Sequence, residues 1–122
     1  LQQYNTNSKV CWVAGFSFGA WVAMQLLMRR PEINGFVSIS PPANNRDFSF
    51  LAPCPSSGLI VHGDKDNIAS FDSAKILAEK LQKQKKVNIK FKPVKGADHF
   101  FENYSDEFTN IVDTYIKDSL KS

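Results

Sequence analysis

The sequence predicts an α/β fold built on a parallel sheet, and two observations support this prediction. The first is that short apolar segments rich in strand-forming residues alternate along the chain with longer segments of helical periodicity. Strands that alternate with helices pair in the parallel sense through right-handed crossovers. The second is that 122 residues, without an internal repeat or a linker, allow one domain around one core. The expected order is strand, helix, strand, loop, strand, helix, strand, helix.

The first expected strand covers residues 9–14, and the helix after it covers residues 20–30. The strand segment is apolar at consecutive positions, which is typical of a strand buried on both faces. The helix is apolar on nearly all sides, which indicates deep burial. Pro31 is expected to end this helix.

The second strand is expected at residues 35–40, where two prolines follow it, and the third at residues 57–63. The segment between them, residues 41–57, is irregular. It contains Phe48, Phe50 and Leu51, which are expected to hold it against the body of the protein. This segment is too short to form a large lid.

The second half of the chain contains an amphipathic helix at residues 71–86 and a strand at residues 87–94. In the strand, apolar and polar residues alternate, which predicts a half-exposed edge strand. The last helix is expected to begin at Ser105, a good N-cap, and acidic residues in its first turn suit the helix dipole. Its apolar stripe consists of Phe108, Ile111, Val112, Tyr115 and Ile116.

The first strand raises the question of whether this sheet is complete. Only three other strands are predicted, so the strand at residues 9–14 would form the edge opposite to residues 87–94. A bare apolar edge promotes aggregation. We therefore expect the sheet to continue beyond the first strand, so that residues 1–122 form a single but partial domain.

Composition argues against several functional classes. No apolar run approaches the roughly 18 residues of a membrane span, and the first nine residues do not resemble a signal peptide. Cys11 and Cys54 lack a metal-binding spacing, and a disulfide between them is not favoured. We therefore expect a cytoplasmic protein without a metal ion or a cofactor.

The charge is mildly positive, at +3, and lysines are concentrated between residues 80 and 95. A basic cluster of this kind can bind nucleic acid or another anionic partner. No aromatic residues interleave on the lysine face, however, as a nucleic-acid surface would favour. The interpretation we favour is a solvated helix end followed by an edge strand, on which lysines discourage pairing. We expect no nucleic-acid partner and no membrane partner.

The segment "GFSFG", residues 15–19, is the candidate catalytic motif. It has the form G-x-S-x-G and lies between a predicted strand and a predicted helix, which is the setting of a nucleophile elbow. Gly15 and Gly19 are expected where side chains would collide with neighbouring backbone. The turn would raise the hydroxyl of Ser17 above the carboxyl edge of the sheet. The alternative is a tight strand-to-helix turn with no catalytic role.

A serine nucleophile needs a base, and the base needs an orienting carboxylate. His99 follows the fourth strand and should lie at the same sheet edge as Ser17, whereas His62 is interpreted as a structural residue at the end of the third strand. For the carboxylate we favour Asp66 over Asp64, because the loop after the third strand can place Asp66 under the imidazole. Asp64 is expected to shape the turn instead. A third carboxylate, that of Asp98, adjoins His99.

The order Ser…Asp…His, with each residue after a different parallel strand, is that of the α/β-hydrolases. The chain resembles the C-terminal part of a small α/β-hydrolase of the dienelactone-hydrolase-like kind, and more narrowly a bacterial group of short, lidless serine hydrolases. The matching stretches are "VAGFSFGAWVA", "RRPEI", "SISPPA", "DFSFLAPCPSSGLIVHGDKD" and "GADHFF".

The resemblance implies that Ser17 is the nucleophile, Asp66 the triad acid and His99 the base. Dienelactone hydrolases proper carry a cysteine nucleophile, so the serine places this chain with the esterase-like relatives. Such proteins have further strands and helices before the nucleophile strand. The resemblance therefore implies that "LQQYNTNSK" is the end of a preceding helix.

The leading hypothesis is a serine hydrolase that cleaves a small ester or related acyl substrate. The backbone N–H of Phe18 would support the oxyanion, and a second donor would come from a loop after an earlier strand. Phe16, Ile68 and Phe100 are candidates to line the substrate pocket. The alternative is a catalytically inactive hydrolase scaffold that acts as a binding module or as a homodimer formed through the first strand.

Overall fold

The sheet of this protein places its strands side by side in the order in which they occur in the chain. The structure is a computed structural model that describes residues 2–7, 10–30, 32–51, 56–83 and 87–120. The strands are β1 (Gln2–Asn7), β2 (Val10–Phe16), β3 (Gly35–Ile39), β4 (Gly58–Gly63) and β5 (Ile89–Val94). The helices are α1 (Phe18–Arg29), α2 (Phe71–Gln82), α3 (Ser105–Leu120) and the short 3-10 turn η1 (Ser49–Leu51).

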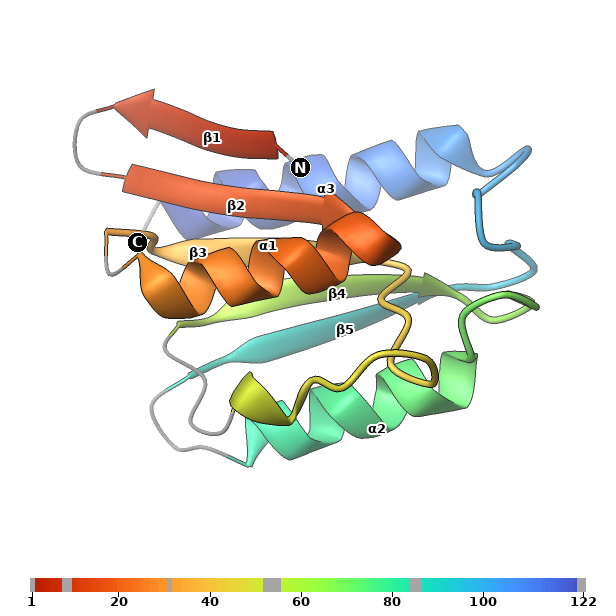
Figure 1. Ribbon diagram of the computed structural model, residues 1–122. Coiled ribbons are helices and arrows are strands. Elements are labelled where there is room, and N and C mark those ends of the chain that lie inside the picture. The colour runs from red at the N-terminus through yellow and green to blue at the C-terminus, as the bar shows by residue number, and fades with distance from the viewer. Residues whose placement is uncertain (1, 8–9, 31, 52–55, 84–86, 121–122) are drawn as a thin grey trace.

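The four strands β2 to β5 pair in the parallel sense, as the sequence predicts. Their carboxyl ends therefore meet at one edge of the sheet, at the right of Figure 1. Three helices accompany these strands, so this part of the α/β-hydrolase fold is confirmed. The alternation in β5 is also confirmed, because Ile89 is buried while Lys90 and Lys92 are exposed.

The segment before β2 differs from the prediction. Residues 1–9 were expected to be the end of a helix, but Gln2–Asn7 forms the strand β1, which pairs with β2 in the antiparallel sense. The physical reason is that the outer edge of β2 carries backbone N–H and C=O groups that need partners. Gln2–Asn7 supplies these partners by antiparallel pairing. The outer edge of β2 is therefore covered by β1 (Figure 1).

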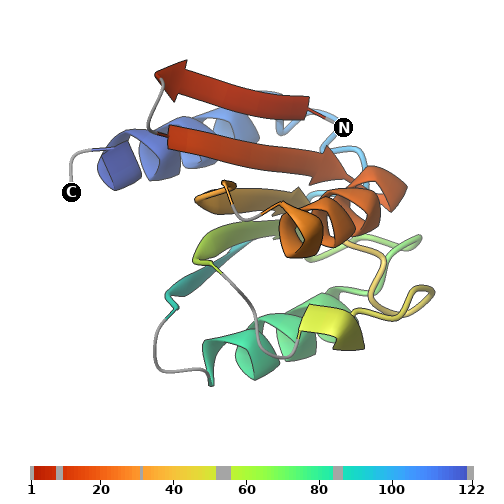
Figure 2. The ribbon, with the colours of Figure 1, turned by 60° about the vertical axis from the view of Figure 1, so that its left-hand side comes forward.

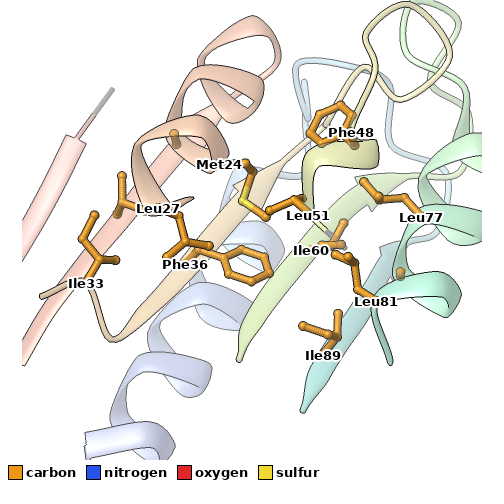
Figure 3. Close-up of a cluster of buried hydrophobic side chains, with 13 residues drawn as sticks. Met24, Leu27, Ile33, Phe36, Phe48, Leu51, Ile60, Leu77, Leu81 and Ile89 are labelled. Carbon is orange, nitrogen blue, oxygen red and sulfur yellow. The ribbon is translucent and has the colours of Figure 1, made fainter. Parts of the chain in front are cut away.

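The helices lie on both faces of the sheet, with α1 and α2 on one side and α3 on the other (Figures 1 and 2). Each face has its own apolar core. The core under α1 and α2 includes Met24, Phe36, Leu51 and Ile60, all at most 1% exposed (Figure 3). On the other face, the rings of Trp12 and Tyr115 meet edge to face with centroids 5.5 Å apart.

The irregular segment after β3 is held in place as expected. Phe48 and Leu51 are buried in the core under α1 and α2, where Figure 3 shows them beside Leu77 of α2. The indole N–H of Trp21 in α1 donates to the backbone oxygen of Asp47, at 3.0 Å. This segment is thereby attached to both helices of its face. Several sequence predictions fall outside the described residues. They concern the helix end at Pro31, the turn that contains Cys54, and Lys85 and Lys86 of the lysine cluster.

In the described part of the chain, no helix combines the length and apolar character that a membrane crossing requires.

Candidate active site

Ser17 lies in a strained turn between the end of β2 and the start of α1. Its backbone angles are φ 56° and ψ −121°, an unusual conformation for a residue with a side chain. The N–H of Ser17 donates to the backbone oxygen of Ile39 at 2.8 Å, which ties the turn to the end of β3. A Cβ atom at Gly15 would lie 2.2 Å from the backbone oxygen of Gly19, so the turn requires glycine at position 15.

The hydroxyl of Ser17 points to a histidine and not to its own helix. A serine at a helix N-cap usually accepts a hydrogen bond from an N–H of the first turn. In this turn Ser17 makes no such bond, and its Oγ instead lies 2.9 Å from Nε2 of His99. The turn thus leaves the hydroxyl available for a partner that is 82 positions away in the sequence.

His99 joins the serine to a buried carboxylate. Its Nδ1 lies 2.7 Å from Oδ2 of Asp66, and its Nε2 faces the hydroxyl of Ser17. The carboxylate can only accept, so the Nδ1–H of His99 donates to Asp66, and Nε2 is the ring nitrogen that faces the serine hydroxyl. The side chains of His99 and Asp66 are 3% and 0% exposed. The three groups form one continuous chain of hydrogen bonds.

The other carboxylates that the sequence offered have different contacts. Asp64 accepts a hydrogen bond from the N–H of Gly96 at 2.6 Å, so it joins the turns that follow β4 and β5. Asp98 accepts from the backbone N–H groups of Phe100 and Glu102. Asp66 is therefore the carboxylate that the fold brings to His99, and Asp64 shapes a turn.

The loop that carries Asp66 is closed by the carboxylate itself. Oδ1 of Asp66 accepts from the backbone N–H groups of Ile68 and Ala69, each at 2.8 Å. Because these two bonds use Oδ1, Oδ2 remains directed at the histidine. These contacts within the loop orient the carboxylate independently of its long-range contact with His99.

Ser40 is a contact of the site that sequence analysis did not identify. It follows β3, is fully buried and has a φ of 51°. Its Oγ donates to the backbone oxygen of His99 at 3.1 Å, and its N–H donates to the backbone oxygen of Val61 at 2.8 Å. Ser40 therefore holds the backbone of the histidine loop against the sheet. The serine before two prolines was the available signal, but nothing local in it points to residue 99.

His62 lies closer to the site than its interpretation as a strand-end residue suggests. It is fully buried, and its Nε2 lies 2.7 Å from the backbone oxygen of Ala69 and 3.3 Å from Oδ2 of Asp66. Burial lowers the pKa of His62 below its ordinary value of 6.5. The Ala69 oxygen and the Asp66 charge oppose this effect, whereas the nearby His99 adds to it.

Two exposed phenylalanine rings lie beside the imidazole of His99. Phe16 and Phe100 are 39% and 64% exposed, and their ring centroids lie 5.2 and 5.0 Å from that of His99. Ile68 is 50% exposed and belongs to the Asp66 loop. Phe18 has a different environment, because its ring lies tilted against that of Trp21, with centroids 5.5 Å apart, and beneath the guanidinium of Arg46. Among the residues that the structure describes, no cluster of histidine, cysteine and acidic side chains could hold a metal ion.

Comparison with known proteins identifies the family. The sequence model of the dienelactone hydrolase family matches residues 1–120. The chain belongs to the dienelactone hydrolase family. It is 51% identical over 120 residues to an uncharacterized protein of Rickettsia prowazekii, a match that covers 95% of this chain and 50% of that protein.

Solved structures agree with the family assignment. An α/β-hydrolase of unknown function from Agrobacterium tumefaciens is 54% identical, with a TM-score of 0.91, over 93% of this chain and 52% of that one. A serine hydrolase without a lid from Xanthomonas campestris is 28% identical, with a TM-score of 0.75, over 87% and 46% of the two chains. The chain thus spans about half the length of these relatives.

Acidification is expected to destabilise this member of the dienelactone hydrolase family through His62. Because burial lowers the pKa of His62, the unfolded chain binds the proton more tightly than the folded chain. Stability should therefore fall as the pH drops below about 6.5, by up to about 1.4 kcal/mol per pH unit, until the lowered pKa is reached.

Urea denaturation between about pH 5 and pH 8 measures this dependence. His62→Gln cannot titrate, so this variant should lose less stability over the same range. Equal slopes in the parent and the variant would contradict the prediction.

Proposed function

We propose that this chain carries the catalytic triad of a serine hydrolase that cleaves a small carboxylic ester or a related acyl substrate. The observation that supports the proposal is the unbroken chain of contacts from Ser17 Oγ through His99 to Asp66, at 2.9 and 2.7 Å. Three separate loops at the carboxyl edge of the sheet supply these groups. Such convergence of residues far apart in sequence is difficult to explain by local packing.

In the proposed mechanism, Ser17 Oγ attacks the carbonyl carbon while Nε2 of His99 takes the hydroxyl proton. The carboxylate of Asp66 stabilises the imidazolium that forms. The tetrahedral intermediate then expels the alcohol, which receives the proton from His99. Water then attacks the acyl-serine ester while His99 takes its proton. The second tetrahedral intermediate releases the acid, and His99 returns the proton to Oγ of Ser17.

One of the two N–H groups that would stabilise the oxyanion belongs to this chain. Phe18 is the first residue of α1, and the first N–H groups of a helix have no partner within the helix. We assign the Phe18 N–H as one donor. In this fold the second donor belongs to a loop after an earlier strand, and losing one donor costs about 10²–10³ in rate. The activity is accordingly proposed for the full-length protein.

The proposed substrate is small and partly apolar. Phe16 and Phe100 place exposed apolar surface beside the imidazole of His99, and the exposed Ile68 belongs to the loop of Asp66. Water is more easily displaced from such surface by an apolar acyl or alcohol group than by a charged one. The relative from Xanthomonas campestris is described as lacking a lid, and we infer a similarly open site here.

The alternative, an inactive scaffold that self-associates through the first strand, has no comparable support, because β1 covers the outer edge of β2. We propose that the protein acts in the cytoplasm without a cofactor, with a small-molecule ester as its partner.

Labelling with a fluorophosphonate probe tests the proposed function. The probe should phosphonylate Ser17 in the folded full-length protein, with the modified peptide identified by mass spectrometry. Urea-unfolded protein and the Ser17→Ala variant should remain unlabelled, since labelling requires the folded triad. Absence of labelling, or labelling mapped to another serine, would contradict the proposal.

A further inference from the structure

His62 is a buried titratable group that the proposed mechanism leaves without a role. We infer that His62 is a positioning residue, whose Nε2–H holds the Asp66–Ala69 turn so that the carboxylate of Asp66 faces His99. This inference rests on the proposed function, because positioning matters only if Asp66 serves the triad.

The tautomer of His62 follows from its neighbours. Nε2 faces the carbonyl oxygen of Ala69 at 2.7 Å and the carboxylate oxygen of Asp66 at 3.3 Å, and both of these atoms can only accept. Nε2 therefore carries the proton. Nδ1 is buried and has no hydrogen-bond partner among the described residues, so a second proton would be unfavourable there. A neutral Nε2–H imidazole fits these surroundings.

The Nε2–H acts on the turn through Ala69. The carbonyl of Ala69 accepts from His62, while the N–H of Ala69 donates to Oδ1 of Asp66. His62 thus holds Ala69, whose N–H in turn holds the carboxylate of Asp66. Ala69 is 0% exposed, so its carbonyl oxygen has no access to water that could replace the imidazole.

The two histidines approach the same carboxylate oxygen from different strands. Oδ2 of Asp66 lies 2.7 Å from Nδ1 of His99, which follows β5, and 3.3 Å from Nε2 of His62, within β4. Three hydrogen bonds hold the two oxygens of the buried carboxylate, two on Oδ1 and one on Oδ2, and the His62 N–H that donates to Ala69 lies beside them. The ring of Phe71 in α2 packs against the imidazole at 6.0 Å between centroids.

Three variants of the full-length protein test the inference. His62→Phe keeps a ring but removes the N–H, whereas His62→Gln retains an N–H near the position of Nε2. Ile60→Val, two residues earlier on the same face of β4, is the control for a core change without loss of the donor. Each variant is assayed for hydrolysis of p-nitrophenyl acetate, with correction for the folded fraction.

We expect His62→Phe to lower kcat on the order of 10–10²-fold with KM little changed, the cost of a small misplacement of a catalytic group. His62→Gln should recover most of this loss, and Ile60→Val should keep the parent kcat. The NMR signal of the proton between His99 and Asp66 should shift in His62→Phe only. Parent kcat in His62→Phe, or equal losses in the Phe and Gln variants, would overturn the inference.

A measurement on the unaltered protein keeps the test independent of folding and of activity. The ¹⁵N chemical shifts of His62 at neutral pH should report a neutral ring with the proton on Nε2. A proton on Nδ1 would overturn the inference, because Nε2 could not then donate to Ala69. If Ser17→Ala hydrolyses the ester as fast as the parent, the proposed function fails, and this result is distinct from either outcome for His62.

Discussion

Replacing Ser17 with alanine is expected to lower kcat for p-nitrophenyl acetate in the full-length protein on the order of 10⁴–10⁶-fold. Without Oγ no acyl-enzyme forms, and His99 has no proton to accept. The residual rate would come from binding and from the oxyanion donor at Phe18. KM should change little, since the hydroxyl contributes mainly to the transition state.

The fold should tolerate this change. Oγ of Ser17 makes its contact with His99 and does not cap α1. The matched control is Ser57→Ala, since Ser57 accepts a hydrogen bond from the N–H of Asn88 at 2.8 Å, just before β4. That bond lies at the opposite sheet edge, so its loss should cost about 1 kcal/mol of stability and leave kcat unchanged. Parent-like hydrolysis by Ser17→Ala would contradict the triad.

The layout of the fold was predictable because its signals are local. The strands β3 and β4 are short apolar runs that end at proline or glycine, and α2 has an apolar stripe with the period of a helix. Burial then follows from that pattern, as in β4, where all six residues are buried. β1 was not predictable, because "QQYNTN" has little apolar character, and its pairing depends on the free edge of β2.

In the candidate site, too, the local features could be predicted from the sequence and the long-range contacts could not. The turn around Ser17 could be predicted because two glycines, a serine and the flanking elements lie within one short stretch. The contacts of Ser40 and His62 could not, since they depend on how loops meet at the sheet edge. Ser40 and the backbone oxygen that it contacts are 59 positions apart. A buried serine and a buried histidine carry no sequence signal that distinguishes support of a site from ordinary packing.

The substitution Asp66→Asn is expected to lower kcat on the order of 10⁴-fold while the fold persists. The amide oxygen of Asn can still accept from the N–H groups of Ile68 and Ala69, which the carboxylate now binds. The amide NH₂ would then face Nδ1 of His99, where two donors oppose one another. His99 is expected to adopt the other tautomer, with its proton on Nε2 directed at Ser17.

In that tautomer His99 cannot accept the serine proton, so the loss should appear in kcat, with thermal stability reduced far less. Asp64→Asn is the matched control, two residues away in the same loop. Its amide oxygen can still accept from the N–H of Gly96, now at 2.6 Å from Asp64, so kcat should stay within a few-fold of the parent. A large loss in Asp64→Asn with little loss in Asp66→Asn would assign the acid to Asp64. Under the proposed function the two carboxylates differ in role because of which N–H each one faces, and this pair of variants measures that difference directly.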